Sequence, residues 1–163
     1  MIPDLAKFQQ KARKQFRENE AFLKKLKQKK PKDLDAVVHQ LHEEVFEQIN
    51  CLDCANCCKT TSPAFYHKDI ERLSRQMKMR PSEFAEDYLQ LDDDGAYMFR
   101  NEPCPFLDAE NYCIYYDFRP LACKEYPLTN RKRFYQMLPL TLKNTLICPA
   151  VLEIVNSLKK CYS

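Results

Sequence analysis

The residues best suited to chemistry in this sequence are its cysteines. Four of the nine cysteines, Cys51, Cys54, Cys57 and Cys58, lie within a run of eight residues. In a Cys-x-x-Cys step the two intervening residues let the chain curl, so that both sulfur atoms face one ion, about 2.3 Å away for zinc. Soft thiolates select zinc, copper(I) or iron–sulfur clusters over magnesium and calcium. The run therefore predicts a site for a soft metal.

Four more cysteines follow this run at wider intervals. They are Cys104, Cys113, Cys123 and Cys148. Cys57 and Cys58 are adjacent, so their side chains diverge unless the backbone turns sharply, and they could serve two metals or one of them could bridge. Eight thiolates suit two four-thiolate sites, or one such site with a separate redox pair, and the sequence leaves both open. Cys161 has no neighbouring cysteine in the C-terminal tail, and we expect a spare thiol there.

Positive side chains lie close to the cysteines in sequence. They are Lys59, Arg119, Lys124 and Arg131. Cationic neighbours offset the negative charge of bound thiolates and lower thiol pKa values. For Arg119, which precedes Pro120, an ion pair with a surface carboxylate is an equally good interpretation.

The three histidines do not complete a metal or catalytic signature. His39 and His42 stand at i and i+3 of a predicted helix, which is not the HExxH arrangement of zinc hydrolases. We expect structural roles for both, and we expect His67 to help cap a helix rather than bind metal. No cysteine is paired with a recognisable base, and no GxSxG serine motif is present. The sequence thus predicts no catalytic residue.

Composition limits the class of protein. The chain of 163 residues is 45% hydrophobic and 30% charged, which suits a folded domain of ordinary size. It has no run of 18 apolar residues and no signal-peptide core near Met1, so we expect a cytoplasmic protein without membrane insertion. In that reducing compartment, clustered cysteines favour metal binding over disulfides. Gly95 is the sole glycine, which excludes glycine-rich phosphate loops.

A basic helix followed by an acidic one is predicted for the first 50 residues. Apolar residues recur every three or four positions between Leu5 and Leu26, Pro31 ends the first helix, and Asp33 is a plausible N-cap of the second. Residues 1–32 carry eleven Lys and Arg against three acids, a net charge of +8, and we expect an antiparallel hairpin with the basic helix against the acidic one. The basic run could also be a nucleic-acid arm. We prefer a solvated helix face, because no aromatic ladder interleaves the lysines and the whole chain carries only +3.

Short elements separated by prolines are predicted for the rest. Helical patterns cover Lys68–Met79 and Phe84–Leu89, Ala96–Arg100 has the composition of a strand, and a last helix begins near Pro149. The stretch between is irregular because of its prolines, which are Pro103, Pro105, Pro120 and Pro127. The fold class is therefore mainly α, a small irregular α(+β) domain stabilised by metal. Residues 1–50 form an N-terminal helical hairpin extension, and residues 51–163 form the cysteine-cluster metal-binding domain.

The order of these motifs is similar to that of a known family. Cys51-x-x-Cys54-x-x-Cys57-Cys58, Cys104-Pro-Phe-Leu, Cys113-Ile-Tyr, Arg119-Pro and Cys123-Lys-Glu-Tyr-Pro resemble the YkgJ-type cysteine-cluster proteins, also described as CxxCxxCC zinc- or iron-chelating domains. The resemblance covers roughly Cys51 to Cys148 and implies that these eight cysteines bind metal. Members commonly have Gly after the second cysteine, where this chain has Ala55 and Asn56. Since Asn tolerates the left-handed region, we expect the turn to shift to Asn56.

These observations predict a cytoplasmic protein that coordinates zinc, or alternatively iron or a 4Fe–4S cluster, through eight thiolates in a structural or metal-handling role. One alternative is an iron–sulfur accessory protein in redox or methyl-transfer chemistry, since related clusters occur in larger flagellin lysine methylases. A second alternative is a zinc-stabilised module for a protein or nucleic-acid partner. We expect the metal ion as the main partner, leave a protein partner open, and do not expect nucleic acid or a membrane.

Overall fold

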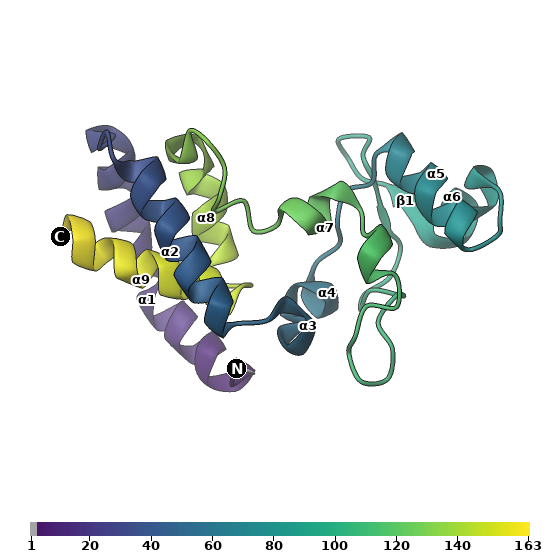
Figure 1. Cartoon of the computed structure of the whole chain (residues 1–163), viewed down its shortest axis with the longest axis horizontal. Helices are drawn as coiled ribbons and strands as arrows, with labels where there is room; N and C mark the ends of the chain where they lie inside the picture. Colours follow the sequence, from purple (N-terminus) through teal and green to yellow (C-terminus); the bar gives the residue numbers. More distant parts are fainter. Residues whose placement is uncertain (1–2) are drawn as a thin grey trace. The chain divides into compact units, whose positions relative to one another are not determined.

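The computed structural model describes residues 3–163, which fall into two compact units. The helical unit joins the chain up to Asn56 with Pro127–Ser163, and the cysteine-rich unit is Cys57–Tyr126. The described residues are mainly helical, with one two-stranded antiparallel sheet (Figure 1). The predicted fold class is thus confirmed, and the domain boundary between residues 50 and 51 stays a prediction. Among the helices of residues 3–163, none has the length and apolar composition needed to cross a bilayer.

The helical unit is built from the two ends of the chain. Its helices are α1 (Leu5–Lys29), α2 (Leu34–Gln48), α3 (Cys51–Cys54), α8 (Leu138–Asn144) and α9 (Pro149–Tyr162), with a 3-10 turn at Phe134–Met137. The Asp4 carboxylate caps α1 by accepting the N–H of Lys7, and Lys30 closes the helix in the left-handed region just before Pro31. Asp33 occupies the N-cap position of α2 as predicted, although its carboxylate accepts from the Tyr162 hydroxyl instead of the helix.

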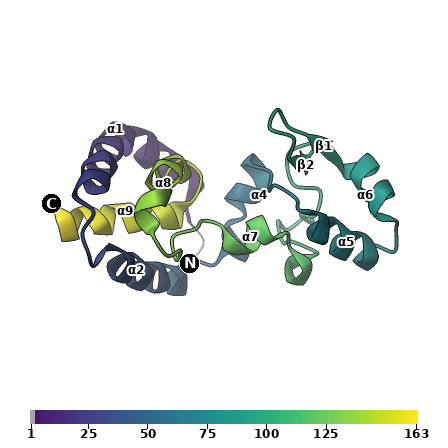
Figure 2. The same ribbon diagram turned by 90° about the horizontal axis from the view of Figure 1, so that it is seen from above.

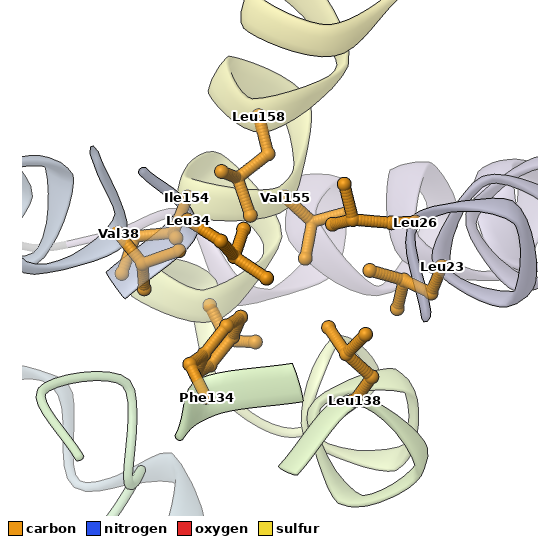
Figure 3. Close-up of a cluster of buried hydrophobic side chains, with 10 residues drawn as sticks. Leu23, Leu26, Leu34, Val38, Phe134, Leu138, Ile154, Val155 and Leu158 are labelled. Atoms are coloured by element: carbon orange, nitrogen blue, oxygen red, sulfur yellow. The ribbon is translucent and has the colours of Figure 1, made fainter. Parts of the chain in front are cut away.

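The core of the helical unit lies where α1, α2 and α9 meet. Figure 2 shows α9 between α1 and α2, and both helices pack on it. Figure 3 shows buried side chains from α1, α2, α8, α9 and the 3-10 turn before α8 pointing into one cluster. The cluster comprises Leu23, Leu26, Leu34, Val38, Phe134, Leu138, Val151, Ile154, Val155 and Leu158. The apolar stripe of α1 is therefore buried against both α8 and the C-terminal helix α9. None of the ten buried residues of this cluster is a cysteine, although the partly buried Cys148 packs against it.

The charges of α1 are not paired with the acids of α2 in the way the sequence suggested. In residues 3–163, the ion pairs that leave α1 run to α9, where Lys11 meets Glu153 at 2.8 Å and Glu18 meets Lys159 at 2.9 Å. On α2, the Asp35 carboxylate instead accepts the backbone N–H groups of Arg133 and Phe134. Helices α1 and α2 pack into one core, as the predicted hairpin requires, but the ion pairs that join α1 to another helix within residues 3–163 run to α9 and not to α2.

The cysteine-rich unit combines short helices with one small sheet. Its elements are α4 (Asn56–Thr60), α5 (His67–Gln76), α6 (Pro81–Tyr88), β1 (Leu89–Leu91), β2 (Tyr97–Phe99), a 3-10 turn at Tyr116–Phe118 and α7 (Leu121–Glu125). The strands pair with Leu89 opposite Phe99, and a turn that contains Gly95 at φ +80° joins them. The core beside this sheet is mostly aromatic and includes Phe65, Phe84, Phe99 and Phe106. Aromatic pairs at 4.7–5.2 Å between ring centroids fix its packing.

Most predicted elements are present, with two corrections. Helices α5, α6 and α9 and strand β2 lie where their patterns predicted them. Leu89, expected to end a helix, instead begins β1, since its pairing with Phe99 outweighs the local helical pattern. The stretch predicted to be irregular also holds α7 and α8, and Pro139 stands in the first turn of α8, where its missing N–H costs nothing.

Candidate metal-binding thiols

Two of the predicted ligands of the helical unit lie on the single turn α3. Cys51 and Cys54 are its first and last residues, and the Asn50 side chain caps it by accepting the N–H of Leu52 at 3.0 Å. Residues three apart on a helix share one face, so both thiols are presented together. The Cys-x-x-Cys spacing thus presents both thiols on one side of a short turn, as the sequence predicted.

The left-handed residue in the turn after Cys54 is Ala55 and not Asn56. Ala55 takes the left-handed conformation with φ 50°, so the expectation that Asn56 would do so is wrong. Asn56 is buried instead, and its amide nitrogen donates to the carbonyl oxygen of Ile147 at 2.6 Å. This hydrogen bond ties the turn of Cys54 to the residue just before Cys148. The strained Ala55 backbone is offset by that buried contact.

Cys148 occupies the N-cap position of α9 and lies close to the thiols of α3. The backbone N–H groups of Ala150 and Val151 at the start of the helix act to lower the pKa of Cys148, although its side chain makes no capping hydrogen bond. Burial, with smaller contributions from the thiols of Cys51 and Cys54, raises the pKa of Cys148 to about 12. The helical unit therefore brings together three of the eight predicted ligands, although Cys148 lies far from the other two in sequence.

The cysteine-rich unit holds the other five of the eight predicted ligands. Cys57 and Cys58 lie on α4, and the hydrogen bond between their side chains lowers the pKa of Cys58 to about 7. Adjacent thiols can touch here because the chain turns through a short helix at this point. The positive charges of Arg119 and Lys59 also lower the pKa of Cys58, as predicted for cationic neighbours.

Cys104 and Cys113 are brought together by a small hairpin. Leu107 and Cys113 form an isolated antiparallel bridge, and the intervening turn is closed by the Asp108 carboxylate, which accepts two backbone N–H groups. The Cys104 sulfur accepts the backbone N–H groups of Phe106 and Leu107. The Cys113 sulfur accepts the backbone N–H of Tyr115. Donors of this kind favour a thiolate. Burial nevertheless raises the pKa of both, that of Cys104 to about 11.

Cys123 on α7 completes a group of four thiols in this unit. Burial, with the thiols of Cys58, Cys104 and Cys113 in smaller proportion, raises the pKa of Cys123 to about 12. The backbone also links the group, since the N–H of Cys104 donates to the carbonyl oxygen of Cys58 at 2.8 Å. We call Cys58, Cys104, Cys113 and Cys123 the four-thiol group. At neutral pH its most buried members are neutral thiols, and a bound cation would replace their protons.

Arg119 is a positive side chain that acts on three members of this group. Its charge lowers the pKa of Cys58, Cys113 and Cys123, and its guanidinium lies 3.6 Å from the centroid of the Tyr116 ring. Of the two interpretations open from the sequence, the structure therefore favours charge compensation at the thiols over a surface ion pair. This arrangement suits an anionic metal–thiolate centre.

Asp69 is a functional-site residue that the sequence analysis missed. Its side chain is 3% exposed and accepts the N–H of Tyr66 at 2.9 Å, the N–H of Leu121 at 3.0 Å and the guanidinium of Arg72 at 2.8 Å. Arg72 also donates to the carbonyl oxygen of Arg119 at 2.7 Å. One carboxylate thus fixes the segment from Arg119 to the start of α7, which carries Cys123. Its only sequence signal is its position at the third residue of a helix.

We predict that Asp69→Ala destabilises the cysteine-rich unit by about 3 kcal/mol, because it leaves the Arg72 guanidinium and two N–H groups without their acceptor. Urea unfolding of the metal-bound protein measures this. Asp87→Ala, an exposed carboxylate on α6, is the matched control and should change stability by less than about 0.5 kcal/mol. Equal midpoints for the two variants would show that the Asp69 contacts do not support the fold.

The remaining predicted positions fall outside both groups of thiols. His39 lies 3.1 Å from the carbonyl oxygen of Arg131, and His42 lies 2.7 Å from the Thr129 hydroxyl, with burial lowering the pKa of His42. Both thus hold hydrogen bonds within the helical unit, as expected for structural histidines. His67 begins α5, where Asp69 makes the cap. Cys161 is exposed in the last turn of α9.

None of the nine cysteines, all of which lie in the described residues, forms a disulfide. Within residues 3–163, no three side chains of His, Cys, Asp or Glu lie close enough to hold one ion as they stand. Binding at either group therefore involves a closer approach of the sulfur atoms than the structure shows. The donors themselves fit a soft metal, because they are all thiols, backbone N–H groups favour the thiolates of Cys104 and Cys113, and Arg119 supplies compensating charge.

The comparisons with known proteins agree with this chemistry. The family described as "CxxCxxCC: Putative zinc- or iron-chelating domain" matches residues 50–141. The chain belongs to this family, and the match covers α3, α4, the whole cysteine-rich unit and most of α8. No curated protein and no solved structure matches the chain.

Proposed function

We propose that the protein is a cytoplasmic metal-binding protein that coordinates zinc, or iron in the form of a cluster, through eight thiolates. They are Cys51, Cys54, Cys57, Cys58, Cys104, Cys113, Cys123 and Cys148. The observation that supports the proposal is the electrostatic influence that the members of the four-thiol group have on one another, although they span 66 positions of sequence and need a closer approach to hold one ion. Family membership and the absence of disulfides among the described cysteines support it.

The proposed ligands form two sets by unit. The four-thiol group has the composition of a structural zinc site, which carries a net charge of about −2 with four thiolates. Arg119 and Lys59 would offset that charge. Cys51, Cys54 and Cys148 form the second set in the helical unit. Cys57, hydrogen-bonded to Cys58, is the eighth proposed ligand.

Iron, bound as a cluster, is the alternative to zinc because the same thiols suit both. Four cysteine thiolates also hold a 4Fe–4S cluster, and N–H groups directed at the sulfurs, as at Cys104 and Cys113, tune such clusters. A zinc-bound protein would have a structural or metal-handling role, whereas a cluster would support redox or methyl-transfer chemistry with a partner. Absorption separates the two at once, since zinc–thiolate centres are colourless and iron–sulfur centres are brown.

We expect protein purified without oxygen to contain about two zinc ions per chain, or about four irons with matching sulfide. Elemental analysis and sulfide determination measure this. A thiol reagent applied to the native protein should then modify Cys161 rapidly, because it is exposed and lies outside both thiol sets. Metal-free protein with nine reactive thiols and an unchanged fold would contradict the proposal.

A further inference from the structure

The outer side of α1 carries a dense row of positive charge. At 100° per residue, Arg13, Lys14, Arg17, Lys24 and Lys25 lie on the side of the helix opposite the buried Ala12 and Leu23. All five are exposed. We call them the basic face. Within the described residues only Lys24 has a carboxylate partner, Glu20 of the same helix at 3.2 Å. The packing of α2 on α9 leaves this charge without acids from the neighbouring helix.

We propose that the basic face binds the phosphate backbone of double-stranded nucleic acid, without preference for base sequence. None of the eight proposed ligands lies on α1, and the proposal does not depend on which metal they bind. The low charge of the whole chain argued against such a partner, but the structure shows that the charge is unevenly distributed. Residues 1–32 carry +8, and the five cations of the basic face lie together on the exposed side of α1. Local charge density, and not net charge, governs contact with phosphates.

The dimensions of α1 suit a duplex. Its 25 residues extend over about 37 Å at 1.5 Å per residue, close to one turn of duplex at about 34 Å. The absence of aromatic residues from the basic face excludes the stacking by which single strands are bound, but a duplex backbone needs cations alone. The side chains at the centre of the outer side are Gln10, Ala21 and Gln28, which can lie flat against a groove edge or donate to phosphates.

Other partners fit this face less well. A membrane-bound helix inserts apolar side chains, and those of α1, such as Phe8 and Leu26, are buried in the helical unit. Protein interfaces are enriched in aromatic residues and depleted in lysine, the reverse of this face. Phosphate oxygens on a duplex are therefore the best match to a row of lysine and arginine without an apolar anchor.

The test uses the full-length, metal-bound protein and a fluorescein-labelled 24-bp DNA duplex. Anisotropy titrations between 50 and 200 mM salt should show binding whose affinity falls steeply with salt. The triple variant Arg13→Gln, Lys14→Gln, Arg17→Gln keeps good helix formers in place. It should bind at least about tenfold more weakly at 50 mM salt and reduce the salt slope by about 2 to 3.

The control removes the same charge elsewhere on the helical unit. Lys132, Lys143 and Lys160 are exposed, and their triple change to Gln should leave affinity and slope within about twofold of the parent. Circular dichroism verifies that both variants are folded. The proposal is overturned if the parent protein does not bind duplex at 50 mM salt, if both triple variants lose affinity alike, or if single-stranded DNA or phosphatidylserine vesicles bind more tightly than duplex.

Discussion

Cys123→Ser is expected to remove the metal of the four-thiol group and to cause the largest loss of stability of any single change at a thiol. The hydroxyl of serine is a poor ligand for a soft ion. Cys123 is buried on α7 among the other members of the group, so no solvent ligand can replace it easily. Structural zinc contributes of order 10 kcal/mol in small finger peptides, which sets the scale of the loss. Metal content and thermal unfolding of the variant measure the two effects.

Two controls separate metal loss from a packing defect. Cys161→Ser alters an exposed thiol outside both sets and should keep the full metal content and melting temperature. Comparison of metal-free Cys123→Ser with metal-free parent should show nearly equal stability, because the two side chains are of similar size. If Cys123→Ser and Cys161→Ser retain equal metal and melt together, Cys123 is not a ligand. If the metal-free forms already differ widely, the defect lies in packing.

Removal of metal should loosen the cysteine-rich unit while the helical unit keeps its core. The helical unit packs ten buried apolar residues from α1, α2, α8, α9 and the turn before α8, and none of the ten is a cysteine, although Cys148 packs against them. In the cysteine-rich unit, Cys104 and Cys113 themselves pack against the aromatic core, and prolines interrupt regular structure between Cys104 and Cys123. Metal bonds would supply order there that local hydrogen bonding does not.

Hydrogen exchange by segment, with and without a strong chelator, checks this expectation. Amides of the cysteine-rich unit, including the Cys104 N–H bonded to Cys58, should lose about tenfold or more of their protection. Amides in the middle of α1 and α9 should change little, and most helical circular dichroism should remain. Equal protection of the cysteine-rich unit in metal-bound and verified metal-free protein would show that the metal is not structural. That outcome would favour redox or transfer chemistry at the same thiols.

The sequence by itself determined the features that depend on local pattern. The spacing of Cys51, Cys54 and Cys57 indicated a soft-metal family before any coordinates, because two intervening residues fix how a short turn presents its thiols. The apolar period predicted α1 and α9 because burial of one helix face repeats every three to four residues. Pro31 and Pro149 marked helix ends for an equally local reason, the missing N–H of proline.

Only the tertiary structure decided which distant residues meet. It brought Cys148 within electrostatic reach of the thiols of α3, did the same for Cys58, Cys104, Cys113 and Cys123 in the other unit, and directed Asp69 to the start of α7. It also paired the charges of α1 with α9 and left the basic face exposed. No repeating pattern of residue types in the sequence predicts these contacts. They arise from loops closed over tens of residues, and the free energy of such closure depends on the packing of the whole unit and not on neighbours in the chain.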